Sequence, residues 1–464
     1  MRLFDTLTRE VRELQPADGA TFRFYCCGPT VYGPSHIGNF RSFVLQDALR
    51  RALEVGGLRT KHVRNITDVD DKTIRDSQAA GRSLAEFTAG WTENFHRDAA
   101  KLNCLPPHVE PCAVEHIPQQ IEMVGELIAK GHAYPSGDGS VYFRIASFPE
   151  YGRLARLDRQ DLELGRAGEG RADADEYEKD GISDFVLWKA RRPEDGENFW
   201  ASPWGEGRPG WHLECSAMIR RYLGESFDLH SGGVDLVFPH HENEIAQSRC
   251  ACGGEFARHW FHIAHLMVEG GKMSKSLGNL HTISGLEGRG FTAKELRYVL
   301  LGGHYRKPLN FTFESMRAAR EALAKLARAE RELARAAGED RPPSYEELRG
   351  MGGFGVFAPA WEALNDDLNT PGALGGLFTG LRTAAEGDAA ANWRAFHAML
   401  GALGLVLPEL VVEEVPDEIR ALAERRQEAR KARDWAAADA MRDELLAQGW
   451  VVKDGKGDYE LERR

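Results

Sequence analysis

The sequence contains little that would place the protein in a membrane or outside the cell. No hydrophobic run reaches the about 18 residues that a membrane span needs. The first residues, Met1-Arg2-Leu3-Phe4-Asp5-Thr6, lack the apolar core of a signal peptide. Cysteine is scarce, with seven in 464 residues, an odd number. We therefore expect reduced thiols or metal ligands rather than a disulfide framework, in a cytoplasmic protein without a membrane partner.

The chain also lacks an excess of positive charge. Its formal net charge is −12, from 59 Lys and Arg against 71 Asp and Glu. This balance argues against a protein that coats nucleic acid nonspecifically, although a large enzyme needs only a local basic stripe to contact phosphates. Hydrophobic residues make up 42% of the sequence. The length and composition predict roughly two to four globular domains.

Strand and helix patterns alternate in the first part of the chain. Residues 21–26 and 61–66 are typical of strands, and between them Phe40, Val44 and Ala48 form an apolar stripe with helical spacing. Residues 71–78 predict a short helix. Strand, helix and strand in this order indicate a right-handed βαβ unit and a parallel sheet.

Changes in composition divide the remainder of the chain. We predict an α/β fold in which a Rossmann-like parallel-sheet domain with an insertion precedes an α-helical bundle and a small C-terminal mixed α/β domain. The predicted ranges are 1–124 for the first half of the sheet domain, 125–205 for the connective insertion, 206–265 for the second half, 266–312 for a lysine loop and the region after it, 313–405 for the bundle, and 416–464 for the C-terminal domain. Within these ranges, 165–184 is expected to be a mobile loop, 315–337 a long helix, and 417–448 a helical pair before a turn-rich tail.

Two motifs far apart in the sequence can hold a polyphosphate. His36-Ile37-Gly38-Asn39 follows a predicted strand and opens a helix, where backbone N–H groups and the helix dipole attract anions. His36 and Asn39 can donate hydrogen bonds to phosphate or ribose, or they can simply cap the helix. Lys272 and Lys275 lie in a glycine-flanked loop, which is either a solvated turn or a source of charge for a transferring phosphoryl group. Together the motifs predict a nucleotidyl-transfer enzyme.

With these motifs the chain resembles class I aminoacyl-tRNA synthetases, although Asn39 stands where a second histidine is more familiar. Four further motifs are similar to those of cysteinyl-tRNA synthetases, namely residues 27–32, 65–72, 210–216 and 238–244. The resemblance runs nearly end to end. It implies that ATP with Mg²⁺, L-cysteine and tRNA(Cys) react through cysteinyl-adenylate, and that residues 266–312 also contact the tRNA stem. We expect a monomer.

The resemblance also implies roles for individual residues. The implied catalytic residues are His36, Asn39, Lys272 and Lys275, and the implied ATP-binding residues are His36, Gly38, Asn39, Gly232, Gly233, Asp235 and Lys275. The implied cysteine-binding residues are Gly28, Thr67 and Trp211, although Trp211 could instead be an ordinary core aromatic. In the C-terminal domain, Arg430, Trp435, Asp439 and Asp454 offer a cation, a stacking surface and two acceptors, which suits anticodon bases.

A metal site is the remaining prediction. His240 and Glu244 are spaced i, i+4 after Pro239 and share a helix face, while His241 with Glu244 is the local competitor. Spacing cannot place Cys27 and Cys215 beside them, but the resemblance implies one Zn²⁺ per chain held by Cys27, Cys215, His240 and Glu244. We hypothesise that this metal selects cysteine over serine, because shape-based pockets separate near-isosteres by only about 1–3 kcal/mol, whereas Zn²⁺ deprotonates a coordinating thiol.

Two other functions are compatible with parts of the sequence. A ligase that joins cysteine to an amino sugar shares the catalytic domain, but it does not need the helical bundle and C-terminal domain. A noncatalytic tRNA-binding paralogue would be free to lose the His36 turn, the Lys275 loop or a zinc ligand, and all of these are present.

Overall fold

The computed structural model describes residues 1–157, 171–172, 184–272, 279–409, 415–454 and 459–463. The chain forms two compact units, residues 1–408 and 409–464, and each is described by itself. Most of the loop predicted at 165–184 lies outside the described residues. The described part of it consists of β7 (Arg171–Ala172) and the first residue of β8 (Asp184–Ala190).

A four-stranded parallel sheet lies at the centre of the first unit, as the sequence predicts. Its strands stand in the order β14 (Trp260–Ile263), β12 (Leu229–Gly233), β3 (Thr21–Cys26) and β4 (Arg59–Arg64). Helix α1 (Ile37–Val55) lies between β3 and β4 in the chain, and α7 (His240–Cys252) lies between β12 and β14. The connection from β3 therefore leads toward one edge of the sheet, and the connection from its neighbour β12 leads toward the other edge. Ligands of open α/β folds bind at such a switch point, beyond the carboxyl ends of the strands.

Helix α1 is buried along most of its length. The predicted stripe of Phe40, Val44 and Ala48 is fully buried and packs in the core that the sheet shares with the bundle. Charged residues on the same face of the helix are also buried, including Asp47 and Arg51. A helix that is covered on both sides needs partners for these polar groups, and the bundle supplies some of them.

The insertion is a mainly antiparallel sheet between the two halves of the parallel one. Its strands stand in the order β5 (Ala133–Pro135), β6 (Val141–Phe143), β8, β10 (Gly205–Pro209) and β9 (Trp200–Ser202), and β7 pairs with β8. Helices α2 (Asp71–Ala79), α3 (Leu84–Lys101) and α4 (Ile117–Ala129) precede it, and α6 (Trp211–Leu223) follows it. The strands and α6 and α7 share a core around Phe143, Phe185 and Trp188.

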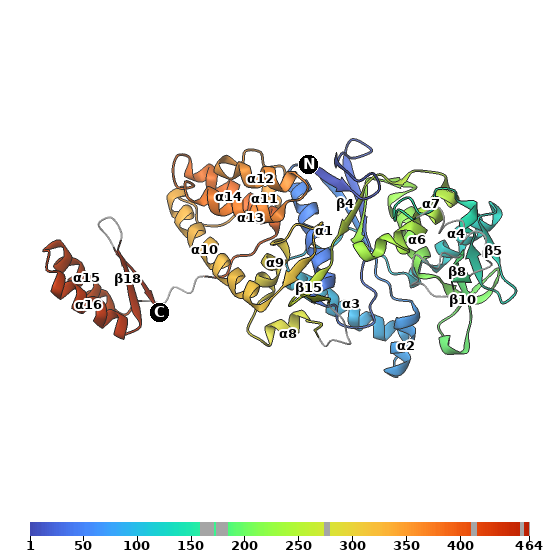
Figure 1. Cartoon of the computed structure of the whole chain (residues 1–464), viewed down its shortest axis with the longest axis horizontal. Helices are drawn as coiled ribbons and strands as arrows, with labels where there is room; N and C mark the ends of the chain where they lie inside the picture. The colour runs from blue at the N-terminus through green and yellow to red at the C-terminus, as the bar shows by residue number, and fades with distance from the viewer. Residues whose placement is uncertain (158–170, 173–183, 273–278, 410–414, 455–458, 464) are drawn as a thin grey trace. The chain divides into compact units, whose positions relative to one another are not determined.

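Short elements and a helical bundle complete the first unit. Two hairpin strands, β1 (Arg2–Asp5) and β2 (Glu10–Glu13), open the chain, and β11 (Ser226–Phe227) pairs with β13 (Phe256–Ala257). After β14 come β15 (Leu266–Val268), β16 (Gly271–Lys272), α8 (Ile283–Glu287), α9 (Ala293–Leu301) and β17 (Leu309–Phe311). The bundle consists of α10 (Phe313–Ala337), α11 (Tyr345–Leu348), α12 (Ala358–Asn365), α13 (Thr370–Leu381) and α14 (Ala389–Leu403). In Figure 1 it lies on one side of α1 and the insertion strands lie on the other.

The long helix predicted from residue 315 is confirmed, and it begins two residues earlier. Thr312 is its N-cap, because the Thr312 hydroxyl oxygen accepts a hydrogen bond of 3.0 Å from the Ser315 backbone N–H. Such a cap satisfies one of the backbone donors that a helix start leaves unpaired.

The second unit is small and mixed. The helical pair predicted over 417–448 is α15 (Asp417–Lys431) and α16 (Trp435–Ala447), and two antiparallel strands follow, β18 (Trp450–Asp454) and β19 (Tyr459–Arg463). The sequence indicates only turns at the end of this tail, and residues 455–458 lie outside the described residues. The core of the unit contains Ile419, Leu422, Ala423, Leu445 and Trp450.

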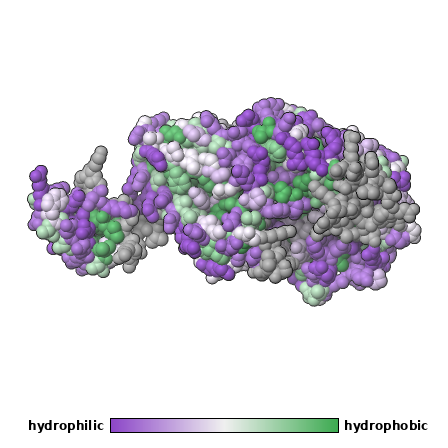
Figure 2. Space-filling model, viewed as in Figure 1, coloured by the Kyte–Doolittle hydropathy of each residue, from purple (hydrophilic) through white to green (hydrophobic). Residues whose placement is uncertain are grey.

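The surface is mostly hydrophilic. On the face drawn in Figure 2, hydrophobic residues form only separate patches among hydrophilic ones. Among the residues that the structure describes, four large hydrophobic side chains are exposed, Val11, Val406, Trp435 and Leu446. None of the described helices combines the length and the apolar character needed to cross a bilayer.

Candidate active site and metal centre

Cys27 follows the last residue of β3 and lies at the carboxyl edge of the parallel sheet. Its backbone N–H donates to the Ser231 carbonyl of β12 at 3.1 Å. The next residue must be glycine, because a Cβ on Gly28 would lie 1.6 Å from the Asn65 carbonyl oxygen. The Gly28 N–H donates to the Asn65 side chain at 2.8 Å. These contacts hold Cys27 at the switch point between β3 and β12.

Two helices bring the other three predicted metal ligands to Cys27. Cys215 lies on α6, and His240 and Glu244 lie one turn apart on α7, with Nε2 of His240 3.0 Å from Oε1 of Glu244. One ligand atom from each of Cys27, Cys215, His240 and Glu244 lies within 4.8 Å of the others, and all four residues are buried. Two thiols, an imidazole and a carboxylate are a donor set that suits a zinc ion. The residues present therefore fit the predicted metal.

A second set of donors overlaps the first. Cys27, His230, His241 and Glu244 also bring one ligand atom each within 4.8 Å of one another. His241, the competitor that spacing left open, has its Nε2 3.3 Å from the Cys27 sulfur and its Nδ1 2.7 Å from Nε2 of His262. Cys27 and Glu244 thus belong to both sets.

His230 is a site residue that the sequence analysis missed. It is fully buried in β12, and its Nε2 lies 2.8 Å from Oε2 of Glu244. Its ring stacks on Trp260 with centroids 4.8 Å apart. The only sequence signal for His230 is its place two residues before Gly232, at the end of a strand, and that signal is weak because such positions are often core.

Three of the four donors stabilise one another in ionised form, whereas burial and the neighbouring Cys215 raise the pKa of Cys27 well above its ordinary value. Burial raises the pKa of Cys215, but hydrogen bonds from Cys27 and His240 outweigh burial and lower it to about 6. Burial also raises the pKa of Glu244, and His230 and His240 more than reverse this, to about 2. His240 is affected in the opposite sense, because Glu244 and Cys215 overcome the effect of burial and raise its pKa to about 10. Thiolate and carboxylate are the forms in which these groups bind metal cations.

The predicted cysteine-binding residues lie beside this cluster. The Trp211 ring is 4.4 Å from the His240 ring between centroids. Thr67 is buried and its hydroxyl donates to the Glu214 carboxylate, next to Cys215 on α6, while it accepts from Asn65 at 3.1 Å. Gly28 is tied to the same Asn65. Trp211 thus contacts a donor directly, and Gly28 and Thr67 are linked to the donor set through chain neighbours of Cys27 and Cys215.

His36 and Asn39 form the helix cap that was the alternative interpretation of their motif. The Asn39 backbone N–H donates to Nδ1 of His36 at 3.2 Å, and the His36 N–H donates to the Asn39 side-chain oxygen at 3.1 Å. A capping role does not exclude phosphate binding, because the cap exposes the start of α1. Asn39 is exposed, and His36 and Gly38 are half-buried.

The segment after the lysine loop pairs with the His36 turn. The Ile37 N–H donates to the His281 carbonyl at 2.9 Å, and His36 forms an antiparallel bridge with Thr282. Lys272 ends β16, and its backbone pairs with β15. Lys275 lies outside the described residues. The backbone that follows the lysine loop, at His281 and Thr282, is therefore bonded to the start of α1, and sequence reasoning did not predict this contact.

Gly232, Gly233 and Asp235 lie at the end of β12, next to the end of β3. A Cβ on Gly232 would lie 2.8 Å from the His241 ring, and one on Gly233 would lie 2.3 Å from the Asp235 carboxylate. Asp235 itself is exposed. Glycines are required here by close packing, and the carboxylate remains accessible to a ligand at the sheet edge.

Two family models match the chain, and together they span most of it. The family model described as the tRNA synthetases class I (C) catalytic domain matches residues 13–321, and that of the cysteinyl-tRNA ligase anticodon binding domain matches residues 412–460. The chain belongs to the class I cysteinyl-tRNA synthetase family. Its curated relatives include proteins named cysteine–tRNA ligase from Opitutus terrae, 54% identical over 100% of this chain and 99% of the relative, and from Chlamydia felis, 42% identical over 99% and 97%.

Solved structures of the synthetase class share the fold. The methionyl-tRNA synthetase of Mycobacterium tuberculosis in complex with methionyl-adenylate aligns with a TM-score of 0.56 and 16% identity, over 83% of this chain and 89% of that one. At this identity the likeness concerns the arrangement of the elements alone. It supports the Rossmann-like parallel sheet and the helical region that follows it.

The family's C-terminal region contains the four predicted anticodon residues. Trp435 begins α16, and 58% of it is exposed. Arg430 and Asp454 form an ion pair, and Asp454 also accepts two hydrogen bonds from Arg426, at 2.7 and 2.9 Å. Asp439 pairs with Arg442 on the same helix at 3.0 Å. Arg426 and Arg442 were missed by sequence reasoning, and the pairs that they form engage both predicted acceptors.

Proposed function

We propose that the protein joins L-cysteine to tRNA(Cys) at the expense of ATP, through a cysteinyl-adenylate intermediate. The observation that carries the proposal is the cluster of Cys27, Cys215, His240 and Glu244, buried beside the strand-to-helix turn that leads to His36. A donor set for a soft cation next to a nucleotide site suits a substrate that offers both a thiol and a carboxylate. The match of residues 412–460 to an anticodon binding domain supports tRNA as the acceptor.

The four donors are proposed to hold one Zn²⁺. When bound, this ion supplies a soft Lewis acid that favours a thiolate over an alkyl hydroxyl, which is harder and far less acidic. His230 and His240 keep Glu244 ionised, and His240 would give up its own proton when the ion binds, because a ligating imidazole is neutral. Selection of cysteine over serine then depends on bond chemistry, since shape alone separates such near-isosteres by about 1–3 kcal/mol.

The residues around the donors are proposed to orient the amino acid. Trp211 supplies an apolar wall in contact with the His240 ring. The Thr67 hydroxyl is fixed by Asn65 and Glu214, and Gly28 leaves backbone exposed where a side chain would not fit. Thr67 and Gly28 are held by hydrogen bonds to Asn65 before a substrate arrives, so little ordering of these two residues remains to be done on binding.

Activation is proposed at the turn that begins α1. ATP, as its Mg²⁺ complex, lies across His36, Gly38 and Asn39, with Gly232 and Gly233 of β12 and Asp235 just after it at the adenosine. The cysteine carboxylate attacks the α-phosphorus, the bond to the pyrophosphate oxygen breaks, and pyrophosphate leaves. Lys272 and Lys275 stabilise charge on the transferring group. The hydroxyl of the tRNA terminal adenosine then attacks the acyl carbon and releases AMP. Positioning and electrostatic stabilisation account for catalysis without a covalent side-chain nucleophile.

Two assays on one preparation test the proposal. Cysteine-dependent exchange of pyrophosphate into ATP reports adenylate formation, and charging of tRNA(Cys) reports transfer. We expect both. Exchange without charging, together with ligation of cysteine to an amino sugar, would favour the amino-sugar ligase. The absence of exchange despite tRNA binding would favour a noncatalytic paralogue.

A further inference from the structure

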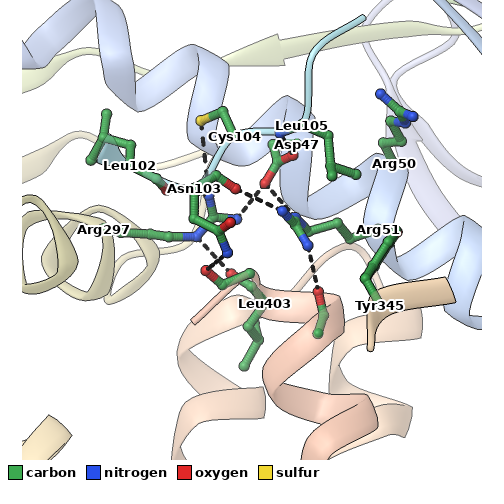
Figure 3. Close-up of polar contacts among 12 residues, drawn as sticks. Asp47, Arg50, Arg51, Leu102, Asn103, Cys104, Leu105, Arg297, Tyr345 and Leu403 are labelled. Atoms are coloured by element: carbon green, nitrogen blue, oxygen red, sulfur yellow. Dashed lines mark hydrogen bonds and ion pairs between the residues drawn. The ribbon is translucent and has the colours of Figure 1, made fainter. Parts of the chain in front are cut away.

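A buried ion cluster joins α1 to the bundle at the point where the chain leaves the bundle for the C-terminal unit. Its centre is Asp47 on α1 (Figure 3). One Asp47 oxygen accepts from Nε of Arg51 at 2.8 Å and from Arg297 of α9 at 2.5 Å, and the other accepts from the Leu105 N–H at 2.8 Å. The three charged side chains are at most 4% exposed.

The two guanidinium groups reach the carboxyl ends of two other helices. Arg297 donates to the Leu403 carbonyl at the end of α14 at 2.9 Å and to the Leu102 carbonyl after α3 at 2.8 Å. Arg51 donates to the Gly401 carbonyl of α14 at 3.3 Å and to the Asn103 carbonyl at 2.7 Å. Figure 3 shows these bonds converging from α1, α9 and α14.

The charges of the cluster explain this arrangement. Two buried guanidiniums face a single carboxylate, so one positive charge remains without a formal partner. The terminal carbonyls of a helix carry the negative end of its dipole, and they accept the remaining donors. Burial raises the pKa of Asp47, but Arg51 and Arg297 hold it below its ordinary value. The ends of α3 and α14 are therefore part of the charge balance, and α14 cannot move away without leaving buried N–H groups of Arg51 and Arg297 without an acceptor.

The turn that ends α14 lies against the ion cluster. Gly404 caps α14 with a φ of +61°, and a Cβ there would lie 2.1 Å from Arg297. The Asn103 side chain donates to the Gly404 carbonyl at 2.9 Å. Four residues later the first unit ends at Pro408, and the unit that matches the anticodon binding domain follows.

The same cluster is connected to the nucleotide site through rigid elements. Asp47 and Arg51 lie on α1, about three and four turns after its cap at His36. Arg297 lies on α9, in the segment between the lysine loop and the bundle. The helix that begins at the proposed ATP site thus binds, at its other half, the last turn of α14, which ends five residues before the first unit ends at Pro408.

We infer that Asp47, Arg51, Arg297 and Asn103 are positioning residues for the tRNA-dependent step, because they fix the end of α14 against the helix that begins at the nucleotide site. The inference rests on the proposed function. Loosening the cluster should impair charging of complete tRNA while adenylate formation, which needs no tRNA, proceeds. An ordinary structural role would reduce both reactions together.

Arg51→Met is the principal variant. Methionine keeps most of the length and the apolar stem of arginine. The substitution removes the charge of Arg51 and leaves Asp47 and Arg297 as a balanced ion pair. Arg50→Met is a matched control on the same helix. Arg50 is also buried and pairs with its i+4 carboxylate, Glu54, but its other bonds go to Pro106 and His108 and none that the structure describes reaches α14.

Three measurements are made on the full-length protein. For Arg51→Met we expect cysteine-dependent pyrophosphate exchange within about twofold of wild type. The kcat for charging complete tRNA(Cys) should be at least about fivefold lower, because about fivefold is the lower end of typical coupling between two sites. Charging of an acceptor-stem minihelix, which cannot reach an anticodon domain, should stay at its wild-type rate. Arg50→Met should leave the ratio of charging to exchange unchanged.

Asn103→Gly keeps the inference testable if Arg51→Met does not fold. It retains every charge, and glycine suits the φ of +56° at this residue. For Asn103→Gly we expect a smaller decrease in the charging rate than for Arg51→Met. In the variant that combines both substitutions, the fold-decrease in charging should be less than the product of the two single fold-decreases. Parallel loss of exchange and charging, unchanged charging, or an equal effect of Arg50→Met would overturn the inference. Absence of both reactions in the wild type would instead overturn the proposed function.

Discussion

His230 and Glu244 are bonded to each other inside the proposed metal site, with Nε2 of His230 2.8 Å from Oε2 of Glu244. The other Glu244 oxygen lies 3.0 Å from His240. Both oxygens of this buried carboxylate are therefore held by imidazoles, one on α7 and one on β12. The orientation of the Glu244 ligand depends on a residue outside the predicted donor set.

This contact predicts the effect of His230→Phe. Phenylalanine keeps a ring to stack on Trp260 but removes the hydrogen bond to Glu244. Loss of a group that orients a metal ligand typically weakens metal binding by about 10- to 100-fold. Competition with a chromogenic zinc chelator should show a weakening of this size. His116→Phe, at a buried histidine whose ring contacts Tyr222 and the Cys112 carbonyl, should bind zinc like the wild type. Equal affinity of His230→Phe and wild type would contradict the role.

Two cysteines on neighbouring helices should respond differently to replacement by serine. In Cys215→Ser a hydroxyl replaces a thiolate ligand, so bound zinc should fall from about one per chain to a small fraction. Exchange with cysteine should fall with it. Cys252, at the end of α7, is a free, half-buried thiol outside both donor sets, and Cys252→Ser should retain zinc and exchange. Elemental analysis of the purified variants decides the point, and zinc retained in Cys215→Ser would show that this sulfur is not a ligand.

Lys275→Ala should separate catalysis from binding. A charge that acts on the developing transition state lowers the barrier without holding the ground state, so we expect kcat for exchange to fall by about 10²- to 10³-fold. The KM for ATP should change by far less. Lys307→Ala, at an exposed lysine of the same unit, should change neither constant. Equal losses in kcat and in ATP affinity would assign Lys275 to ground-state binding instead.

Much of the fold follows from local patterns in the sequence, whereas the polar contacts of the site do not. The apolar stripe of Phe40, Val44 and Ala48 predicts α1 because burial of one helix face repeats with the helical period. Asp47 and Arg51 fall on the same face by this period, and the apolar stripe gives no reason to expect charged side chains to be buried there. Their burial depends on α14, which comes from another part of the chain.

The donor set shows the same limit. Helical spacing pairs His240 with Glu244, and the family resemblance adds Cys27 and Cys215, which the structure brings together. Neither signal includes His230, since its contact with Glu244 depends on strand β12 lying beside helix α7. The pairing of Ile37 with His281 is likewise a contact between distant segments, and no periodic pattern indicates it.

Trp435 provides the cleanest test of the C-terminal unit. Because 58% of this residue is exposed, its removal should cost the fold little, unlike removal of Asp454, which holds Arg426. Stacking on a base contributes about 1–3 kcal/mol, so Trp435→Ala should raise the KM for tRNA(Cys) by about 5- to 150-fold. Exchange should be unchanged. Leu446→Ala, at another exposed residue of α16, is the control. Normal charging kinetics in Trp435→Ala would remove this residue from the anticodon site.

The central claim is that a zinc ion at Cys27, Cys215, His240 and Glu244 selects cysteine by its sulfur. The most direct measurement is pyrophosphate exchange with cysteine and with serine, before zinc removal, after it, and after zinc is restored. We predict exchange with cysteine only while zinc is bound, recovery when it is restored, and none with serine in any state. Metal-free protein that still activates cysteine and still rejects serine would contradict the account.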